Sequence, residues 1–212
     1  MKTREKLVLF GAGGHAKVVI DIVEQQGNFE IAGLLDDDLK HQGKRFFGYP
    51  VLGTRADLPA LLSAQLRHAI VTIGDNASRA GVAAHLNELG WRFASAVHPR
   101  ASIGRGAQIG PGSVVMAGCV INSDTVLGAH VIVNTGATVD HDCRIGDAVH
   151  IGPGCHLCGG VRVGAGTLLG AGSTVTPGVN IGSRATIGAG STVIRDVADG
   201  TKVSGSPARP LD

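Results

Sequence analysis

The chain has 212 residues, including 33 glycines and only one Trp and one Tyr, and its formal net charge is +2 at pH 7. This length accommodates one or two domains. With no basic tract and no interleaving of basic and aromatic residues, nothing in the sequence indicates nucleic-acid binding. No apolar run is long enough for a membrane span, and the N-terminal residues lack the apolar region of a signal peptide. We therefore expect a cytoplasmic protein with no membrane and no nucleic acid among its partners.

The first elements in chain order are those of an α/β unit. The apolar run at 6–10 predicts a strand, a glycine-rich turn follows it, and a helical pattern then extends to Gly27. A second strand is expected at 31–35, directly before three aspartates. The remaining elements expected are a helix at 58–66, a strand at 69–74, a helix at 78–89 and a strand at 92–97. Residues 1–96 are thus predicted to form a small Rossmann-like α/β domain.

The glycine-rich turn at 11–16 matches G-x-G-x-x-A, with Asp36 about 20 residues further on, which is the pattern of a dinucleotide-binding turn. Backbone N–H groups and the helix dipole favour phosphate at such a turn. A nicotinamide enzyme would need a second nucleotide-binding half or a catalytic domain, and the remaining chain has neither pattern. We therefore predict a nucleotide diphosphate, with Asp36 and Asp37 bonded to its base or ribose. A tight turn without a ligand is the alternative.

From Val97 to Val193 every sixth residue is Val, Ile or Leu. A period of six matches neither a helix nor an alternating strand and is typical of a hexapeptide β-helix. The residue four positions after each aliphatic is interpreted as a small side chain throughout, as expected for a cramped interior. One position after the aliphatic, Gly, Asn or Asp predominates, and we expect these residues to adopt the unusual backbone angles of tight corners. Three hexads form one triangular coil, so this stretch holds about five coils.

The four cysteines are expected to be structural. Cys155 and Cys158 form a C-x-x-C, a spacing also found in zinc and redox sites. However, Cys119, Cys143 and Cys155 occupy the small inward position of the hexad, and Cys158 lies at a corner. Buried packing explains this placement without a metal.

Several motifs together resemble one family. They are GAGGHAKVV near the N-terminus, LLDDD after the second strand, the hexapeptide array, VDHDCRIGDAVHIGPG in its middle and GSPARP at the end. The chain resembles the bacterial nucleotide-sugar acetyltransferases, which acetylate amino sugars for glycan assembly and have close relatives described as sialic acid O-acetyltransferases. The resemblance covers essentially the whole chain. It implies a left-handed parallel β-helix over 97–212, with a short C-terminal tail, and a homotrimer that binds acetyl-coenzyme A between neighbouring β-helices.

The same resemblance implies roles for individual residues. The catalytic histidine of the family falls on His141, and the acidic residue after it falls on Asp142, where the best-studied members have the longer Glu. Gly159 matches a backbone amide that faces the thioester oxygen. The residues matched to coenzyme binding are His150, Ala171 and Ala189. The substrate-binding residues expected around the glycine-rich turn are Ala12, Gly13, Gly14, His15, Asp36, Asp37 and Gly74. No metal is expected, because a thioester is already activated.

The reaction expected is acetyl-coenzyme A-dependent N-acetylation of a UDP- or GDP-linked 4-amino-4,6-dideoxy sugar. A histidine titrates near neutral pH and can accept the proton that an amino sugar must lose. Three alternatives remain: O-acetylation of sialic acid, a trimeric nucleotide-binding scaffold without catalysis, and a β-helix carbonic anhydrase. The last needs histidines two whole coils apart, whereas His141 and His150 are half a coil apart. His141 occupies an outward position, so an ordinary surface histidine is the alternative to catalysis.

Overall fold

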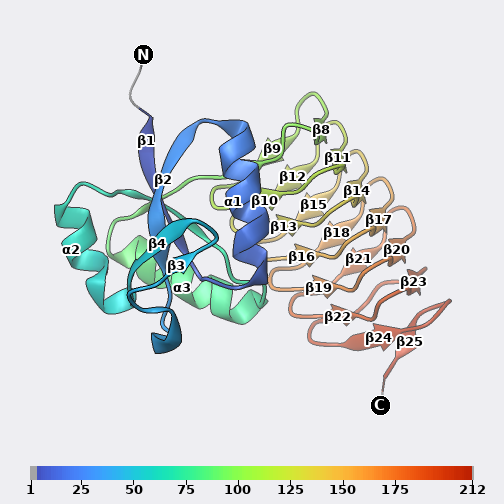
Figure 1. Ribbon diagram of the computed structural model, residues 1–212. Coiled ribbons are helices and arrows are strands. Elements are labelled where there is room, and N and C mark those ends of the chain that lie inside the picture. The colour runs from blue at the N-terminus through green and yellow to red at the C-terminus, as the bar shows by residue number, and fades with distance from the viewer. Residues whose placement is uncertain (1–3, 212) are drawn as a thin grey trace.

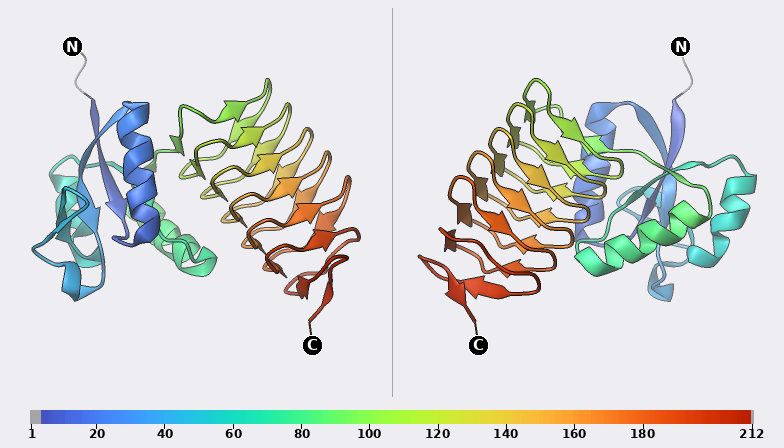
Figure 2. Two further views of the ribbon diagram at one scale, coloured as in Figure 1. Left: turned by 45° about the vertical axis from the view of Figure 1, so that its right-hand side comes forward. Right: turned by 180° about the vertical axis from the view of Figure 1, so that it is seen from behind.

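The computed structural model describes residues 4–211 and shows an α/β part beside a three-sided solenoid of stacked coils (Figure 1). The N-terminal strand and the C-terminal hairpin lie at opposite ends of the molecule (Figure 2). The helices within residues 4–211 are all too short or too polar to span a bilayer. The fold class expected from the sequence, an α/β domain followed by a hexapeptide β-helix, is confirmed.

The α/β part is a six-stranded sheet with helices on both faces. Its strand order is β3-β4-β2-β1-β5-β6, with β1 in the interior. The strands are β1 (Glu5–Phe10), β2 (Phe29–Leu35), β3 (Arg45–Phe46), β4 (Tyr49–Gly53), β5 (His68–Val71) and β6 (Arg92–Phe93). The helices are α1 (Gly14–Gln26), α2 (Leu58–Ser63) and α3 (Asn76–Glu88), with single 3₁₀ turns at Leu39–His41 and Arg55–Asp57.

The two faces of this sheet carry separate cores. On one face Leu7 and Leu9 pack against Val19 and Ile20 of α1, and this core continues into the solenoid. On the other face the strand residues pack against α2 and α3, with Leu86 fully buried. Helix α1 therefore lies between the sheet and the solenoid, and the two parts share one apolar core.

The expected elements of this part are present, but the helix expected at 58–66 ends at Ser63 and the strand expected at 69–74 ends at Val71. Two larger differences concern the number of strands. The antiparallel pair β3–β4 was not expected, although its turn at Phe47 and Gly48 has positive φ at both positions, the mark of a two-residue hairpin. The single strand expected at 92–97 is two strands. Residues 92–93 extend the α/β sheet, whereas β7 (Ala96–Val97) is the first strand of the solenoid. Residues 94–95 carry the chain from one sheet to the other.

The solenoid has three sheets, in which the strands between residues 96 and 193 are parallel and successive strands are 18 residues apart, as Val115, Val133 and Ile151 illustrate. The first sheet contains β7, β10 (Val114–Val115), β13 (Ile132–Val133), β16 (His150–Ile151), β19 (Leu168–Leu169), β22 (Thr186–Ile187), β24 (Lys202–Ser204) and β25 (Arg209–Pro210). The second contains β8 (Ser102–Ile103), β11 (Val120–Ile121), β14 (Thr138–Val139), β17 (His156–Leu157), β20 (Thr174–Val175) and β23 (Thr192–Val193). The third contains β9 (Gln108–Ile109), β12 (Val126–Leu127), β15 (Arg144–Ile145), β18 (Arg162–Val163) and β21 (Asn180–Ile181). The first sheet ends differently, because β24 follows β22 by 16 residues and β25 pairs antiparallel with β24.

The explanation expected for the glycine one position after each aliphatic is wrong. Positive φ occurs two positions later, for example at Gly154, Gly160 and Asp142. The earlier glycines are required by close approach of the next coil instead. A Cβ on Gly164 would lie 2.3 Å from the backbone N of Ser183, and one on Gly110 would lie 2.3 Å from the carbonyl O of Gly128. Stacking of coils, not corner conformation, selects glycine there.

The inward position is confirmed as a buried one, and its polar members follow one rule. Each hydroxyl or thiol except that of Ser191, which is buried without a partner within residues 4–211, donates to the carbonyl 15 residues further on, in the next coil. The pairs are Ser113 to Gly128, Cys119 to Asn134, Thr125 to Asp140, Cys143 to Cys158, Cys155 to Gly170, Thr167 to Gly182 and Ser173 to Gly188. The four cysteines are free thiols, and burial raises the pKa of those at 119, 143 and 155, so the structural reading holds.

Candidate active site

A pocket of about 510 Å³ opens at the carboxyl ends of β1, β2 and β5. The chain passes from β1 to β2 on one side and returns to β5 on the other, so the pocket lies where the strand order reverses, the usual ligand site of a parallel sheet. It is lined by all seven predicted substrate-binding residues: Ala12, Gly13, Gly14, His15, Asp36, Asp37 and Gly74. Thr72 and Ser78, which were not expected, also line it.

The glycine-rich turn leaves the start of α1 open to a ligand. Gly13 is the N-cap residue and supplies no side-chain hydrogen bond to the first turn. A Cβ on Gly13 or Gly14 would have no atom within 4 Å, so the space above them is free. Gly11 has φ of +117° and lies against Thr72, whose hydroxyl donates to the carbonyls of Phe10 and Gly11. The free N–H groups and the helix dipole suit a phosphate.

The two aspartates after β2 differ in their surroundings. Asp36 accepts from the backbone N–H of Ala12 at 2.6 Å and braces the turn. Asp37 accepts from Arg55 Nη2, also at 2.6 Å, and from the Arg55 backbone N–H at 3.0 Å. Partial burial acts to raise the pKa of Asp37, but these hydrogen bonds together lower it. Asp37 is therefore anionic, and Arg55 holds it in place at the pocket.

Two predicted site histidines, His15 of α1 and His150 of the solenoid, lie near enough for the charge of one to affect the other. His15 is the second residue of α1, and its buried Nε2 has no hydrogen-bond partner within residues 4–211. Burial, then the nearby His150 and Arg79, lower its pKa to about 4. His150 lies on β16 with Nε2 3.2 Å from Asn134 Nδ2, and its pKa is also lowered, mainly by burial. Both imidazoles are neutral at pH 7, and the structure brings a predicted substrate residue close to a predicted coenzyme residue.

His141 and Asp142 form a pair at the corner between the second and third sheets. The Nδ1 of His141 lies 2.8 Å from Asp142 Oδ2. The short aspartate reaches the ring because its own backbone is left-handed, with φ of +60°. Asp140 accepts from the His141 backbone N–H at 2.9 Å. The hydrogen bond that His141 donates to Asp142, then the charge of Asp140, raises the pKa of His141, which is exposed. Its Nε2 is left free to act as a base.

Gly159 lies one coil above His141 at the same corner. A Cβ there would be 2.6 Å from Cε1 and 2.7 Å from Nε2 of the imidazole, so the ring rests against the bare Cα. The Gly160 N–H donates to the His141 carbonyl at 2.9 Å. Within residues 4–211 the Gly159 N–H has no backbone acceptor and can donate outward. Histidine, carboxylate and backbone donor thus meet on two consecutive coils.

Within one chain the three predicted groups do not form a single site. His141 and Gly159 occupy the corner between the second and third sheets. Ala171 and Ala189 are exposed and stacked at the corner between the first and second sheets, where the Gly190 N–H donates to the Ala171 carbonyl. The nucleotide-type pocket lies beside the first sheet. Because His141 and His150 are half a coil apart, they point from different sides of the solenoid, as their spacing predicts.

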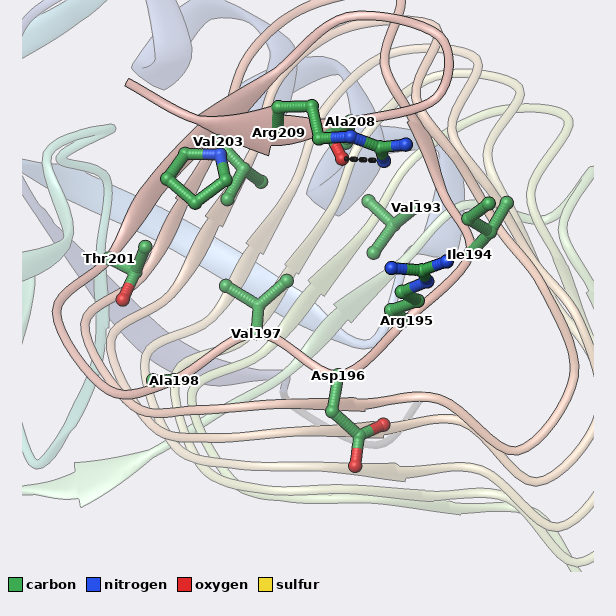
Figure 3. Close-up of a pocket in the computed structure, with 11 residues that line it drawn as sticks. Val193, Ile194, Arg195, Asp196, Val197, Ala198, Thr201, Val203, Ala208 and Arg209 are labelled. Atoms are coloured by element: carbon green, nitrogen blue, oxygen red, sulfur yellow. Dashed lines mark hydrogen bonds between the residues drawn. The ribbon is translucent and has the colours of Figure 1, made fainter. Parts of the chain in front are cut away.

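Another cavity, of about 360 Å³, lies at the C-terminal end of the solenoid (Figure 3). Val193, Val197 and Val203 line it, with Arg195 and Arg209 at its edge. None of the predicted site residues lines this cavity, which lies where the apolar interior of the last coil meets the C-terminal hairpin. Within residues 4–211 there is no group of three or more His, Cys, Asp or Glu arranged to hold a metal ion.

Family models match both parts of the chain. Residues 6–86 match the PglD N-terminal domain, and residues 100–135 and 142–177 match the bacterial transferase hexapeptide repeats. Residues 160–195 also match the hexapeptide repeat of succinyl-transferase. A curated relative, UDP-N-acetylbacillosamine N-acetyltransferase of Bacillus subtilis, is 36% identical over 118 residues, which are 53% of this chain and 52% of that protein. The chain therefore spans about half the length of this curated relative.

Solved structures match over nearly the whole chain. The perosamine N-acetyltransferase of Caulobacter crescentus, as a histidine-to-asparagine variant in complex with CoA and GDP-perosamine, is 40% identical with a TM-score of 0.94, covering 99% of this chain and 98% of that one. The acetyltransferase domain of PglB from Neisseria gonorrhoeae is 39% identical with a TM-score of 0.91, covering 98% and 100%. The same domain has been solved with acetyl coenzyme A. The chain belongs to the hexapeptide-repeat N-acetyltransferases of nucleotide-linked amino sugars.

Proposed function

We propose that this protein transfers the acetyl group of acetyl-coenzyme A to the amino group of a UDP- or GDP-linked 4-amino-4,6-dideoxy sugar. The observation that carries this proposal is the pocket at the carboxyl ends of β1, β2 and β5, which gathers every predicted substrate residue around an open helix N-terminus. The solved relatives support the acceptor class, because the Caulobacter crescentus enzyme is bound to GDP-perosamine. The curated relative carries a UDP sugar in its name, so both bases remain in the proposal.

The chemistry assigns a task to each residue of the corner. The sugar amine attacks the thioester carbonyl carbon as the neutral amine, and His141 Nε2 accepts the proton that the nitrogen loses as the C–N bond forms. Asp142 fixes the ring through Nδ1 and stabilises the imidazolium that forms. The Gly159 N–H donates to the developing oxyanion, a contribution of about 3 kcal/mol in measured oxyanion holes. The C–N bond forms, the C–S bond breaks, and coenzyme A leaves as the thiolate.

A homotrimer would unite the groups that one chain keeps apart. His141 lies on a corner that the α/β part of its own chain does not cover, since Arg79 and Asn76 hold that part against the corner between the third and first sheets. In a closed threefold assembly, His141 of one protomer would face the pocket and His150 of the next. The coenzyme would then lie between two solenoids, along the corner that carries Ala171 and Ala189.

We also propose a cytoplasmic location. The four cysteines are free thiols, three of them buried in the solenoid, which suits a reducing compartment.

The test is a coenzyme A release assay with acetyl-coenzyme A and a panel of UDP- and GDP-linked 4-amino sugars, with free sialic acid alongside. We expect release with a nucleotide-linked amino sugar and a product heavier by one acetyl group. The His141→Ala variant should turn over at least ~100-fold more slowly, the usual share of general base catalysis. Release with sialic acid alone would overturn the acceptor. No release and no coenzyme A binding by calorimetry would leave only the scaffold function.

A further inference from the structure

Arg79 on α3 is a charged side chain with only 1% of its surface exposed. Its guanidinium uses all five of its N–H donors. Nε donates to the His130 carbonyl at 2.9 Å, and Nη1 donates to the carbonyls of Ile73 and Gly74 at 3.1 and 2.9 Å. Nη2 donates to Asn76 Oδ1 and to the Ala148 carbonyl, both at 2.8 Å. Every acceptor is a neutral oxygen.

These acceptors belong to two parts of the molecule, the wall of the nucleotide-type pocket and the corners of the solenoid. Ile73 and Gly74 line the nucleotide-type pocket. His130 and Ala148 are the left-handed corner residues of two consecutive coils, with φ of +57° and +53°. Arg79 therefore joins the wall of the pocket directly to the solenoid.

Asn76 extends the same contact by one coil. Its Nδ2 donates to the carbonyls of Gly166 and Thr167 at 3.0 and 3.1 Å. Gly166 follows Ala148 by 18 residues at the same corner. Arg79 and Asn76 thus contact three consecutive coils from the first turn of one helix, and we call this pair the α3 clamp. Strand β16, which follows the corner at Ala148, begins at His150.

The charge of Arg79 is retained at a cost. Burial lowers its pKa to about 10, so it is still a cation at pH 7, and no carboxylate among residues 4–211 forms an ion pair with it, although the charge of Asp75 is near enough to oppose this lowering. Burying a charge without a counter-ion is unfavourable unless its hydrogen bonds are complete. Apolar side chains in place of Arg79 could also hold the α/β part against the solenoid. What a saturated guanidinium adds is a fixed direction for each of five bonds.

We propose that Arg79 is a positioning residue for acetyl transfer, whose five hydrogen bonds set the pocket wall at Ile73–Gly74 relative to the solenoid coil that carries His150. The inference rests on the proposed function and assigns this reaction a residue that touches neither the acceptor sugar nor the thioester. Positioning errors of about 1 Å, even from changes far from the chemistry, can lower a rate by about 100-fold.

The test compares Arg79→Lys with Leu86→Ala. Lysine keeps the charge but has three donors, so at least two of the five bonds are lost. Leu86 lies on the same helix and is fully buried in the core that α2 and α3 form with the sheet. It is not among the residues that line the pocket, and it takes no part in the hydrogen bonds of the clamp. Both variants are expected to unfold at lower temperature. Measured well below the melting temperature of each, Arg79→Lys should lower kcat by at least ~10-fold, and Leu86→Ala by less than about twofold.

Two further readouts separate positioning from general destabilisation. A nucleoside diphosphate, UDP or GDP, should bind Arg79→Lys within about fivefold of wild type by calorimetry, since the glycine-rich turn is intact. Amide hydrogen exchange should increase at residues 73–75 and 148–150 in Arg79→Lys and not in Leu86→Ala. Asn76→Ala, which removes the contacts to one coil and one of the five acceptors of Arg79, should give a smaller loss of kcat and serves if Arg79→Lys does not fold.

The outcomes are distinguishable. Normal kcat in both Arg79→Lys and Asn76→Ala, with an active wild type, would overturn the positioning role and leave the proposed function standing. Equal losses of kcat in Arg79→Lys and Leu86→Ala would also overturn it. A wild type that releases no coenzyme A would refute the proposed function, and the positioning role with it, whatever hydrogen exchange showed of the clamp.

Discussion

At the scale of single residues, the pair of His141 and Asp142 shows what a short side chain can do in the right backbone conformation. The aspartate replaces the glutamate that the resemblance implies, yet its left-handed backbone brings the carboxylate to 2.8 Å from Nδ1. The sequence could predict which residues meet here, since they are adjacent in the chain. It could not predict that Asp37 is held by Arg55, because that contact joins residues 18 apart through two loops.

Replacing Asp142 with Asn should change the pH profile of acetyl transfer. The pKa of His141 is raised first by Asp142 and then by Asp140, so removing one carboxylate lowers it. Because the base acts in its neutral form, the acid limb of kcat/KM should move to lower pH, while the plateau falls through weaker orientation of the ring. Asn also tolerates the left-handed conformation, so the corner itself is kept. An acid limb at unchanged or higher pH would contradict the pairing.

Gly159→Ala should impair turnover with little effect on stability. The new Cβ would meet the His141 imidazole at 2.6 Å and displace it. The corner backbone accepts alanine, because the same hexad position holds Ala117, Ala165, Ala171 and Ala189 in other coils. We expect a loss of at least ~10-fold in kcat, since a displaced base loses its share of the rate, with a melting temperature within a few degrees of wild type. A variant with normal kcat would contradict the claim that His141 acts as a base from its position against Gly159.

At the scale of the element, the hexapeptide period predicted each strand of the solenoid from β7 to β23 and the inward side chains between them, whereas β24 and β25 lie beyond the end of the period at Val193. It did so because one coil repeats the environment of the last, so position in the hexad determines burial. The reason for the glycines was missed, since it lies in the contact between coils and not in the corner itself. The α/β part was less predictable, and the pair β3–β4 was missed because strands of two and five residues leave little periodicity.

Gly164→Ala should therefore destabilise the solenoid more than a change at a left-handed corner. A Cβ at 164 would lie 2.3 Å from the backbone N of Ser183, where no flexible side chain can yield. Overpacking of this kind costs about 1–3 kcal/mol in free energy of unfolding. Gly154→Asn is the matched control, since φ there is +62°, the space is open, and asparagine tolerates that conformation. Denaturant unfolding of both variants gives the comparison, and equal losses would refute the stacking argument.

At the scale of the whole molecule, the proposal depends on assembly. The solenoid presents three flat sheets, and the α/β part covers one of its corners through the α3 clamp. The corner with His141 and the corner with Ala171 remain open, and closed threefold symmetry is the assembly that would bring them to a neighbouring pocket. Sedimentation at micromolar concentration should give a trimer, and a monomer would contradict the composite site. This arrangement could not be derived from the period of the sequence, which describes one chain.

The most direct test of the account is complementation between two inactive variants. His141→Ala keeps the pocket and loses the base. Gly13→Glu keeps the base and places a carboxylate where the diphosphate would bind, in open space that accommodates it. Each variant alone should be nearly inactive in coenzyme A release. Co-expressed in equal amounts, they should recover activity at about a quarter of their sites, because half the pockets are intact and half of those face an intact His141 of another protomer. Activity no higher than that of the separate variants would contradict a site shared between chains.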